Sequence, residues 1–419
     1  MQDGTAKPRK VVVIGAGVVG MGCASYLQRD GHDVTVIDRV APGKSCSFGN
    51  GGGITTTSVL PLAMPGMMPT LVKWLFDPMG PLSVRWAYAP RLIPFLWRFW
   101  RNTKPERVRA ITDALTTFMP PAYEAWEPLL EDAGLTHLVR HTGGLWLYRD
   151  DRELDRNWMP WQARQDRGLA IERIGANRIR QLEPAVSRRF NAGVIEPEWR
   201  YVRDPFEIVN GLAEHFKRRG GAILEEEVKG FEMSPAGPRA VHTDRGRRDF
   251  DAVVIAAGAW SHRLSAQLGS RVPLESQRGY HITLPNPGIE VRHIIMIGVA
   301  RVAITPMTMG LRLVGAAEFP GVDAPPNYRQ AQMVLAWGKR ALPDLNTEGY
   351  TEWAGDRPLL PDSMPVIGPS PHYENVFYAF AHSHMGLTTG AMTGKLIAEL
   401  VGGRPTSIDL EPFRIDRRF

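Results

Sequence analysis

Hydrophobic residues near the start of the chain follow a strand–helix–strand order. Val11–Ile14 is a continuous apolar run, and Val34–Ile37 is apolar except for Thr35; such runs are typical of parallel strands buried on both faces. The residues between them predict a helix that connects the two strands. The pattern therefore predicts a β-α-β unit that opens an α/β domain.

Glycine spacing gives this unit a candidate chemistry. Gly15, Gly17 and Gly20 match GxGxxG where the first strand turns into the helix. Such glycines permit a tight turn, a close approach of pyrophosphate to backbone and close helix–strand packing. Asp38 ends the second strand, where an acid can accept hydrogen bonds from a ribose. These features predict a cofactor that contains adenosine, and they leave both NAD and FAD open.

Three later segments favour FAD over NAD. Residues 45–57, SCSFGNGGGITTT, follow the second strand with small side chains that let a flat ring lie against backbone. Asp251–Ser261 is an apolar strand that ends in Ala-Ala-Gly-Ala and returns the chain to the nucleotide fold. Residues 377–401 predict a strand, a turn and a helix whose N-terminus suits an electron-rich target such as a flavin pyrimidine.

Composition narrows the class of protein. The 419 residues allow two domains, and 43% hydrophobic with 22% charged residues is ordinary for a globular chain. A net charge of +6 alone does not indicate nucleic acid, and we expect no nucleic-acid partner. The two cysteines, Cys23 and Cys46, lack metal-ligand spacing, so we expect no metal site and a reducing compartment.

Residues 59–101 are the one segment that suggests a surface partner. The first ten residues lack an apolar signal core, which predicts a cytoplasmic protein. Residues 59–101 interleave four tryptophans with five basic residues and one acid, and seven prolines divide them into short pieces. Two interpretations stay open: helices packed on the substrate domain, or peripheral contact with the inner face of the cytoplasmic membrane. Membrane contact would make a quinone the natural electron acceptor.

Two further motifs carry a family resemblance. WAGDRPLLPDSMPVIGP, Trp353–Pro369, and SQRGYHIT, Ser276–Thr283, resemble signatures of the D-amino-acid oxidase superfamily of FAD-dependent oxidoreductases. The chain is most similar to the bacterial D-amino-acid dehydrogenase small subunit and the D-hydroxyproline dehydrogenase type. The resemblance implies an α/β fold, with a Rossmann-like FAD-binding domain interleaved with a mixed β-sheet substrate domain. The FAD-binding domain would comprise residues 1–60, 195–275 and 340–419, and the substrate domain residues 61–194 and 276–339.

The resemblance also implies a set of FAD-binding residues. Gly15, Gly17 and Gly20 would hold the pyrophosphate. The remaining expected contacts are Asp38, Arg39 and Val228 at the adenosine, Ser47, Asn50 and Gly51 at the flavin, Ala257 and Gly258 under the dinucleotide, and Gly386, Leu387 and Thr388 at the pyrimidine. The Gly49 loop has no histidine, and no cysteine follows Cys46, so non-covalent FAD is favoured.

Amine oxidation by a flavin needs a substrate held in place more than it needs acid–base groups. Arg357 is the candidate for binding the substrate carboxylate, and the alternative is a structural pair with Asp356 or Asp362. Tyr280 is either a second carboxylate ligand or a core tyrosine. His384 is either a substrate contact or a turn residue, and we assign no catalytic base. Ala381 stands where the resemblance expects glycine.

These observations predict an FAD-dependent dehydrogenase that oxidises a D-amino acid, such as D-proline or a D-hydroxyproline, to the imino acid. Hydride would pass from Cα to flavin N5 and onward to a respiratory-chain or quinone acceptor. The alternatives are an oxygen-using oxidase of glycine, sarcosine or another secondary amine, and a non-catalytic flavin-binding scaffold. The enantiomer rests on the resemblance alone, because an arginine can hold either one.

Overall fold

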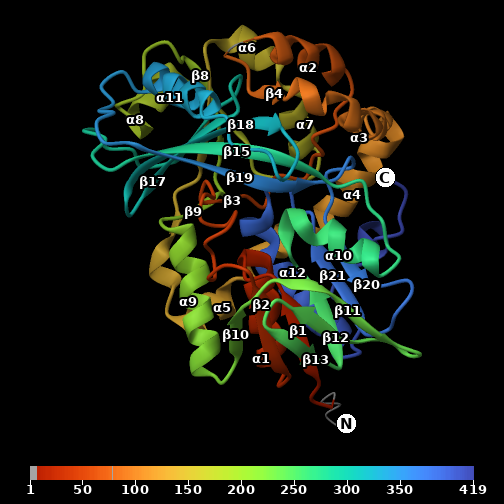
Figure 1. Ribbon diagram of the computed structural model, residues 1–419. Coiled ribbons are helices and arrows are strands. Elements are labelled where there is room, and N and C mark those ends of the chain that lie inside the picture. The colour runs from red at the N-terminus through yellow and green to blue at the C-terminus, as the bar shows by residue number, and fades with distance from the viewer. Residues whose placement is uncertain (1–6, 78) are drawn as a thin grey trace.

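The computed structural model describes residues 7–77 and 79–419. The expectation about an export signal therefore falls partly outside the described residues. Two main sheets form the molecule: strands of a large mixed sheet cross its upper half in Figure 1, and a parallel sheet with its helices forms the lower half. This arrangement matches the expected α/β class.

The lower sheet has six strands in the order β10-β2-β1-β14-β21-β20. Its neighbouring strands pair in parallel except β20 and β21, which are antiparallel. The apolar runs are almost fully buried, as a parallel sheet covered on both faces requires. The bounds are β1 Lys10–Ile14, β2 Asp33–Asp38, β10 Ala222–Glu225, β14 Ala252–Ile255, β20 Val366–Pro369 and β21 Val376–Phe380.

Helices α1 (Val18–Arg29) and α12 (Gly386–Val401) pack closely on this sheet. A Cβ atom on Gly22 would lie 2.5 Å from the carbonyl oxygen of Gly390, and one on Gly394 would lie 2.3 Å from that of Gly22. Glycine at these positions therefore lets the two helix backbones touch. Helix α9 (Pro205–Arg218) begins with Asp204, whose side chain accepts from Phe206 N, and packs against α1.

The upper sheet has nine strands, with the path β19-β15-β18-β17-β16-β6-β8-β7 and β4 beside β18. Helix α11 (Arg329–Ala341) lies against β18 and β15 and covers one face. The strands are β4 Leu82–Val84, β6 Gly144–Tyr148, β7 Glu172–Gly175, β8 Ala192–Glu196, β15 Glu275–Leu284, β16 Ile294–Ile297, β17 Val302–Met307, β18 Gly310–Phe319 and β19 Thr351–Leu359.

The position of β19 corrects one expected boundary. We expected residues from 340 onwards in the FAD-binding domain, but β19 pairs with β15 along its whole length, from Thr351 to Leu359. Residues 351–359 therefore belong to the upper sheet, and the chain re-enters the lower sheet only at β20. This matters for function because β19 carries Arg357.

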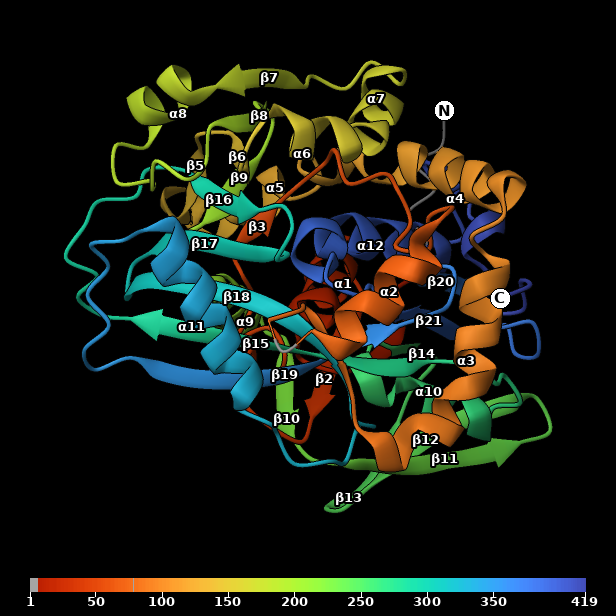
Figure 2. The ribbon, with the colours of Figure 1, turned by 90° about the horizontal axis from the view of Figure 1, so that it is seen from above.

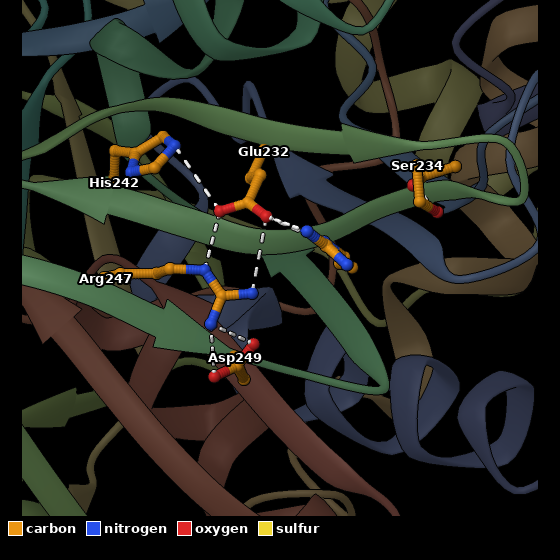
Figure 3. Close-up of polar contacts among 7 residues, drawn as sticks. Glu232, Ser234, His242, Arg247 and Asp249 are labelled. Carbon is orange, nitrogen blue, oxygen red and sulfur yellow. Dashed lines mark hydrogen bonds and ion pairs between the residues drawn. The ribbon is translucent and has the colours of Figure 1, made fainter.

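Two small sheets complete the strands. β3 (Gly53–Ile54), β9 (Arg200–Val202) and β5 (Val139–His141) form one, which connects the Gly49 loop to the upper half. β11 (Val228–Ser234), β12 (Gly237–Thr243) and β13 (Gly246–Asp249) form the other, an antiparallel meander. The meander carries ion pairs on its surface, Arg247 with Glu232 of β11 and with Asp249 of its own strand β13 (Figure 3).

Residues 59–101 fold into short pieces, as the prolines predicted. Helices α2 (Met67–Phe76) and α3 (Ala89–Arg101) flank β4, and α4 (Pro105–Phe118) follows. Figure 2 shows α3 and α4 on the side of the molecule opposite α11. Leu92, Phe95 and Phe99 pack inward from α3. Among the described residues, no helix is both long and apolar enough to cross a membrane.

Short helices fill the remaining connections. They are α5 Glu127–Ala133, α6 Asp151–Arg156, α7 Met159–Gln165, α8 Ala176–Leu182 and α10 Ser261–Gln267.

Candidate active site

A cavity of about 810 Å³ lies between the two main sheets. Its floor is formed by the turns that follow β1, β2, β14 and β21, the edge at which doubly wound sheets bind ligands. Its roof is formed by β15, β17, β18 and β19 of the upper sheet. All of the expected cofactor-binding residues line this cavity except Gly20 and Thr388.

The glycine turn after β1 is shaped by backbone contacts. Gly15 has φ +117°, and a Cβ atom there would lie 2.3 Å from the carbonyl oxygen of Ala256. Gly20 serves packing, because its Cβ would overlap the carbonyl oxygen of Gly15. Asp38 Oδ2 accepts from Ala16 N at 2.7 Å, so this carboxylate also ties the turn to β2. Desolvation raises the pKa of Asp38, against the lowering effect of the Ala16 and Val40 amides.

The end of the cavity near Arg39 contains a residue that the sequence did not reveal. The guanidinium of Arg39 lies over the ring of Trp260, 3.9 Å from its centroid. Val228, at the start of β11, lines the same end together with Ala257 and Gly258. Trp260 was missed because it lies beyond the Ala-Ala-Gly-Ala run, where no spacing marks it.

The Gly49 loop is fixed from both sides by the protein itself. Ser47 Oγ accepts from Val18 N at 3.0 Å, which places Ser47 at the N-terminus of α1. Asn50 Oδ1 accepts from Gly52 N at 2.8 Å and closes a turn. Gly51 lines the cavity, and its carbonyl oxygen accepts from Thr305 Oγ1 at 2.7 Å.

Two glycines of this loop have a different cause from the one we expected. The sequence suggested that Gly49–Gly53 are small because a flavin approaches their backbone. A Cβ atom on Gly49 would lie 1.9 Å from the ring of Trp353, and one on Gly52 would lie 2.7 Å from the carbonyl oxygen of Val202. Packing within the chain therefore already requires glycine at both positions.

Buried basic groups hold this loop from the upper sheet. Arg312, 3% exposed, donates to the carbonyl oxygens of Phe48 at 3.0 Å and Asn50 at 2.9 Å, and burial lowers its pKa to about 10. His281 Nδ1 lies 3.2 Å from the carbonyl oxygen of Gly49, and its ring stacks on Trp353. Desolvation, reinforced by Arg312, lowers the pKa of His281 to about 3, so its imidazole is neutral at neutral pH.

Arg357 is a partly buried cation that lines the cavity without an acidic partner among the described residues. Its Nη1 donates to the carbonyl oxygen of Ala316 at 3.1 Å. Its guanidinium lies over Gly279, where a Cβ atom would be 2.0 Å from Nη2. Desolvation lowers its pKa, and the nearby Cys46 opposes this.

The structural alternative for Arg357 is wrong. Asp356 pairs with Arg278 at 3.0 Å, and Asp362 pairs with Arg417 at 2.8 Å. Neither acid is left for Arg357. Its side chain is therefore available to an anion that enters the cavity.

Tyr280 borders the cavity, but its hydroxyl has partners inside the protein. It donates to Glu318 and accepts from Asn327 N at 2.8 Å. Desolvation, together with the adjacent Glu318, raises its pKa. Of the two alternatives for Tyr280, these contacts favour the core tyrosine, which connects β15, β18 and the segment before α11.

The turn after β21 brings His384 to the cavity. Its Nδ1 lies 3.2 Å from Ser383 Oγ. Desolvation within the cavity and the charges of Arg357 and Arg301 lower the pKa of His384 to about 4. Ala381 has φ +66°, a left-handed conformation that explains why the resemblance expected glycine there.

Helix α12 directs its N-terminus at the cavity. Gly386 and Leu387 line the wall, and the Leu387 carbonyl oxygen accepts from Trp126 Nε1 at 2.9 Å. Thr388 does not face the cavity, because its Oγ1 accepts from Thr55 N at 3.1 Å and its side chain is buried. The helix dipole adds partial positive charge at this end of the cavity.

These features of the chain fit FAD. The cavity is long enough to reach from Arg39 to the Gly49 loop, and the N-termini of α1 and α12 both face it. A family model described as DAO, FAD dependent oxidoreductase, matches residues 10–400. The chain belongs to the DAO family of FAD-dependent oxidoreductases.

Curated relatives of this DAO-family chain cover nearly its whole length. A protein named D-amino-acid oxidase from Bradyrhizobium diazoefficiens is 35% identical over 412 residues, which is 97% of this chain and 98% of the relative. A protein named D-amino acid dehydrogenase from the same organism is 30% identical over 424 residues, which is 97% of this chain and 98% of the relative.

Solved structures show the same fold. L-proline dehydrogenase from P. horikoshii superposes with a TM-score of 0.75 at 22% identity, covering 98% of this chain and 97% of that one. Glycine oxidase from Geobacillus kaustophilus gives a TM-score of 0.74 at 21% identity, covering 98% of this chain and 99% of that one. At these identities the likeness concerns the fold alone.

The DAO-family cavity also has walls that the sequence did not reveal. Beyond Arg357 it is lined by aromatic and basic side chains from distant segments: Trp146, Tyr148, Trp161, Arg164, Trp199 and Arg301. None belongs to a motif, and they meet only because β6, α7, β9 and the β16–β17 turn converge. No local pattern in the sequence would have found them.

Proposed function

We propose that this chain is an FAD-dependent dehydrogenase that oxidises a D-amino acid to the imino acid. The observation that carries the proposal is Arg357, a desolvated guanidinium on the cavity wall with no acidic partner among the described residues. Relatives named D-amino-acid oxidase and D-amino acid dehydrogenase support the same substrate class.

In this proposal the residues of the chain hold the substrate rather than react with it. Arg357 pairs with the substrate carboxylate, while the Ala316 carbonyl and the space over Gly279 fix its guanidinium plane. His384, neutral at neutral pH, offers an acceptor to the substrate amine. FAD, when bound, supplies at N5 the acceptor for the hydride that leaves Cα.

We propose that FAD binds without a covalent link. Cys46 lines the cavity, and desolvation, only partly offset by Arg357, raises the pKa of its thiol to about 11. The thiol is therefore protonated at neutral pH and is a poor nucleophile.

For the electron acceptor we propose a quinone that is reached from a membrane surface. The cavity continues beneath α2 and α3 as an apolar extension, lined by Leu60, Leu62, Met64, Met67, Leu71, Phe95 and Phe99. Above it, several large apolar side chains are exposed: Val72, Phe76, Trp86, Ile93, Trp97 and Trp100. Exposed apolar residues beside Lys73, Arg91 and Arg101 suit an anionic lipid surface.

An oxygen-using oxidase is the second candidate. The relative named D-amino-acid oxidase, at 35% identity, favours it. Both candidates share the reductive step and differ only in how the reduced protein is reoxidised.

Anaerobic reduction of the purified holoprotein tests the proposal. Bleaching of the flavin absorption is measured with D- and L-enantiomers of a panel that includes both prolines, hydroxyprolines and sarcosine. We expect bleaching by D- but not L-amino acids, and bleaching by none would contradict the proposal. The reduced protein is then mixed with air or with a short-chain quinone. Fast reaction with quinone and slow reaction with air supports the dehydrogenase, and the reverse supports the oxidase.

A further inference from the structure

The end of the cavity beyond Arg357 carries more positive charge than one substrate carboxylate can neutralise. We define this distal pocket by Trp146, Tyr148, Trp161, Arg164 and Arg301. We infer that the substrate carries a second carboxylate on its side chain, as an amino dicarboxylic acid does, and that Arg301 binds it. The inference rests on the proposed function and specifies its substrate class.

Arg301 is placed at the pocket by a strained turn. It lies between β16 and β17 with φ +53°, a conformation that is uncommon for residues other than glycine. Its side chain is exposed and lines the cavity, and the protein around it lowers the pKa of its guanidinium by desolvation. No ion pair joins Arg301 to an acid within residues 7–77 and 79–419. A strained backbone that holds an unpaired cation at a cavity wall is typical of a ligand-binding position.

Arg301 and Arg357 belong to the same wall. Arg357 donates to the carbonyl oxygen of Ala316, and a Cβ atom on the preceding Gly315 would lie 3.6 Å from the carbonyl oxygen of Arg301. Arg301, Arg357 and His384 all line the cavity. One substrate can therefore reach the two cations together.

The acid nearest the distal pocket does not neutralise it. Glu196 is fully buried behind the wall, and its carboxylate accepts from Trp146 Nε1 at 2.7 Å and from the Thr57 hydroxyl. Arg164 reaches only the carbonyl oxygen of Thr57, at 3.0 Å, and stacks over Trp161. The distal pocket thus has two arginines, Arg164 and Arg301, against a single engaged carboxylate, so it keeps a net positive charge.

This imbalance discriminates between substrates. A neutral side chain, including the ring of D-proline, would cover the exposed Arg301 without pairing with it, which costs binding free energy. A side-chain carboxylate would pair with it while the α-carboxylate pairs with Arg357.

The test compares isosteric substrates that differ in charge. Anaerobic flavin reduction gives the second-order rate constants for D-glutamate against D-glutamine and for D-aspartate against D-asparagine. We expect the acid to exceed its amide on the order of 100-fold in at least one pair. Equal or faster reduction by the amides overturns the inference and leaves the proposed function standing. Reduction by no amino acid at all would overturn both.

The variant Arg301→Asn tests whether Arg301 causes the preference for the acid over its amide. Arg301→Asn keeps a residue that tolerates positive φ, and we expect it to lose most of the acid preference through a higher KM for the acid. The rate constant for the amide should stay the same or rise, because the variant removes the cation that a neutral side chain leaves unpaired. Arg173→Asn, an exposed arginine on β7 outside the cavity, is the matched control and should retain the preference. Retention of the preference in Arg301→Asn would overturn the assignment.

Discussion

The arginines of the meander β11–β13 pair with acids, whereas two arginines of the cavity do not. On the meander, Glu232 accepts from Arg247 at 2.6 Å and also from Arg239, while Arg247 pairs with Asp249 at 2.7 Å (Figure 3). In the cavity, Arg357 is partly exposed, Arg301 is exposed, and neither has an acidic partner among the described residues. The buried Arg278, which lies opposite Asp356 across the sheet, does have such a partner. The difference indicates that the cavity is built for an anion supplied from outside.

Removing Arg357 should have the largest effect on function. In Arg357→Met we expect the rate constant for flavin reduction by a D-amino acid to fall by about 10³-fold, because the carboxylate loses its partner in a desolvated site. The melting temperature should stay the same or rise, because the variant removes a partly buried charge that has no acidic partner among the described residues. Stopped-flow absorbance and thermal unfolding measure the two. An unchanged rate constant would remove Arg357 from substrate binding.

Breaking the buried pair beside Arg357 should have the largest effect on stability. Asp356→Asn leaves Arg278 buried without its partner, and the two side chains are only 14% and 4% exposed. We expect a loss of about 3 kcal/mol in the free energy of unfolding, measured with urea. A loss under about 0.5 kcal/mol would show that the pair with Asp356 does not stabilise Arg278, so that Arg278 would not differ from Arg357 in this respect.

The buried His382 should make the stability of the protein depend on pH. Desolvation lowers the pKa of the buried His382 to about 3, so between about pH 6 and pH 4 the unfolded chain binds a proton there and the folded chain does not. Stability therefore falls as the pH falls through this window, by up to about 1.4 kcal/mol per pH unit from this group. His382→Gln should reduce the slope of unfolding free energy between pH 6 and pH 5 by that amount. An unaltered slope would mean that His382 is protonated in the fold.

The smallest effect is expected on the meander. Glu232→Gln removes the acid shared by Arg239 and Arg247, whose side chains are exposed. We expect the melting temperature to change by less than about 1 °C, because exposed pairs add little to stability. A larger drop would contradict the contrast between the two regions.

The lower sheet could be predicted from sequence because its signals are local. The apolar runs at Val11–Ile14 and Val34–Ile37, the glycine spacing and the terminal Asp38 lie within one β-α-β unit, and the structure has them in register. Arg357 could also be selected, since it lies in a motif. These features depend on neighbours in the chain.

The features that could not be predicted depend on distant segments. Tyr280 is engaged by Glu318 and Asn327, which only the pairing of β15 with β18 brings to it. Arg301 lies in a turn without a motif, and its neighbours Tyr148 and Arg164 come from β6 and α7. The extent of the upper sheet was missed for the same reason, because β19 joins it by pairing rather than by pattern.

The central claim is that Arg357 binds the carboxylate of an amino-acid substrate. Anaerobic flavin reduction by a D-amino acid and by its carboxamide, in the wild-type protein and in Arg357→Met, tests it most directly. We predict rapid reduction of the wild-type protein by the acid, slow reduction by the amide, and loss of most of this difference in the variant. Equal reduction of the wild-type protein by acid and amide would contradict the claim.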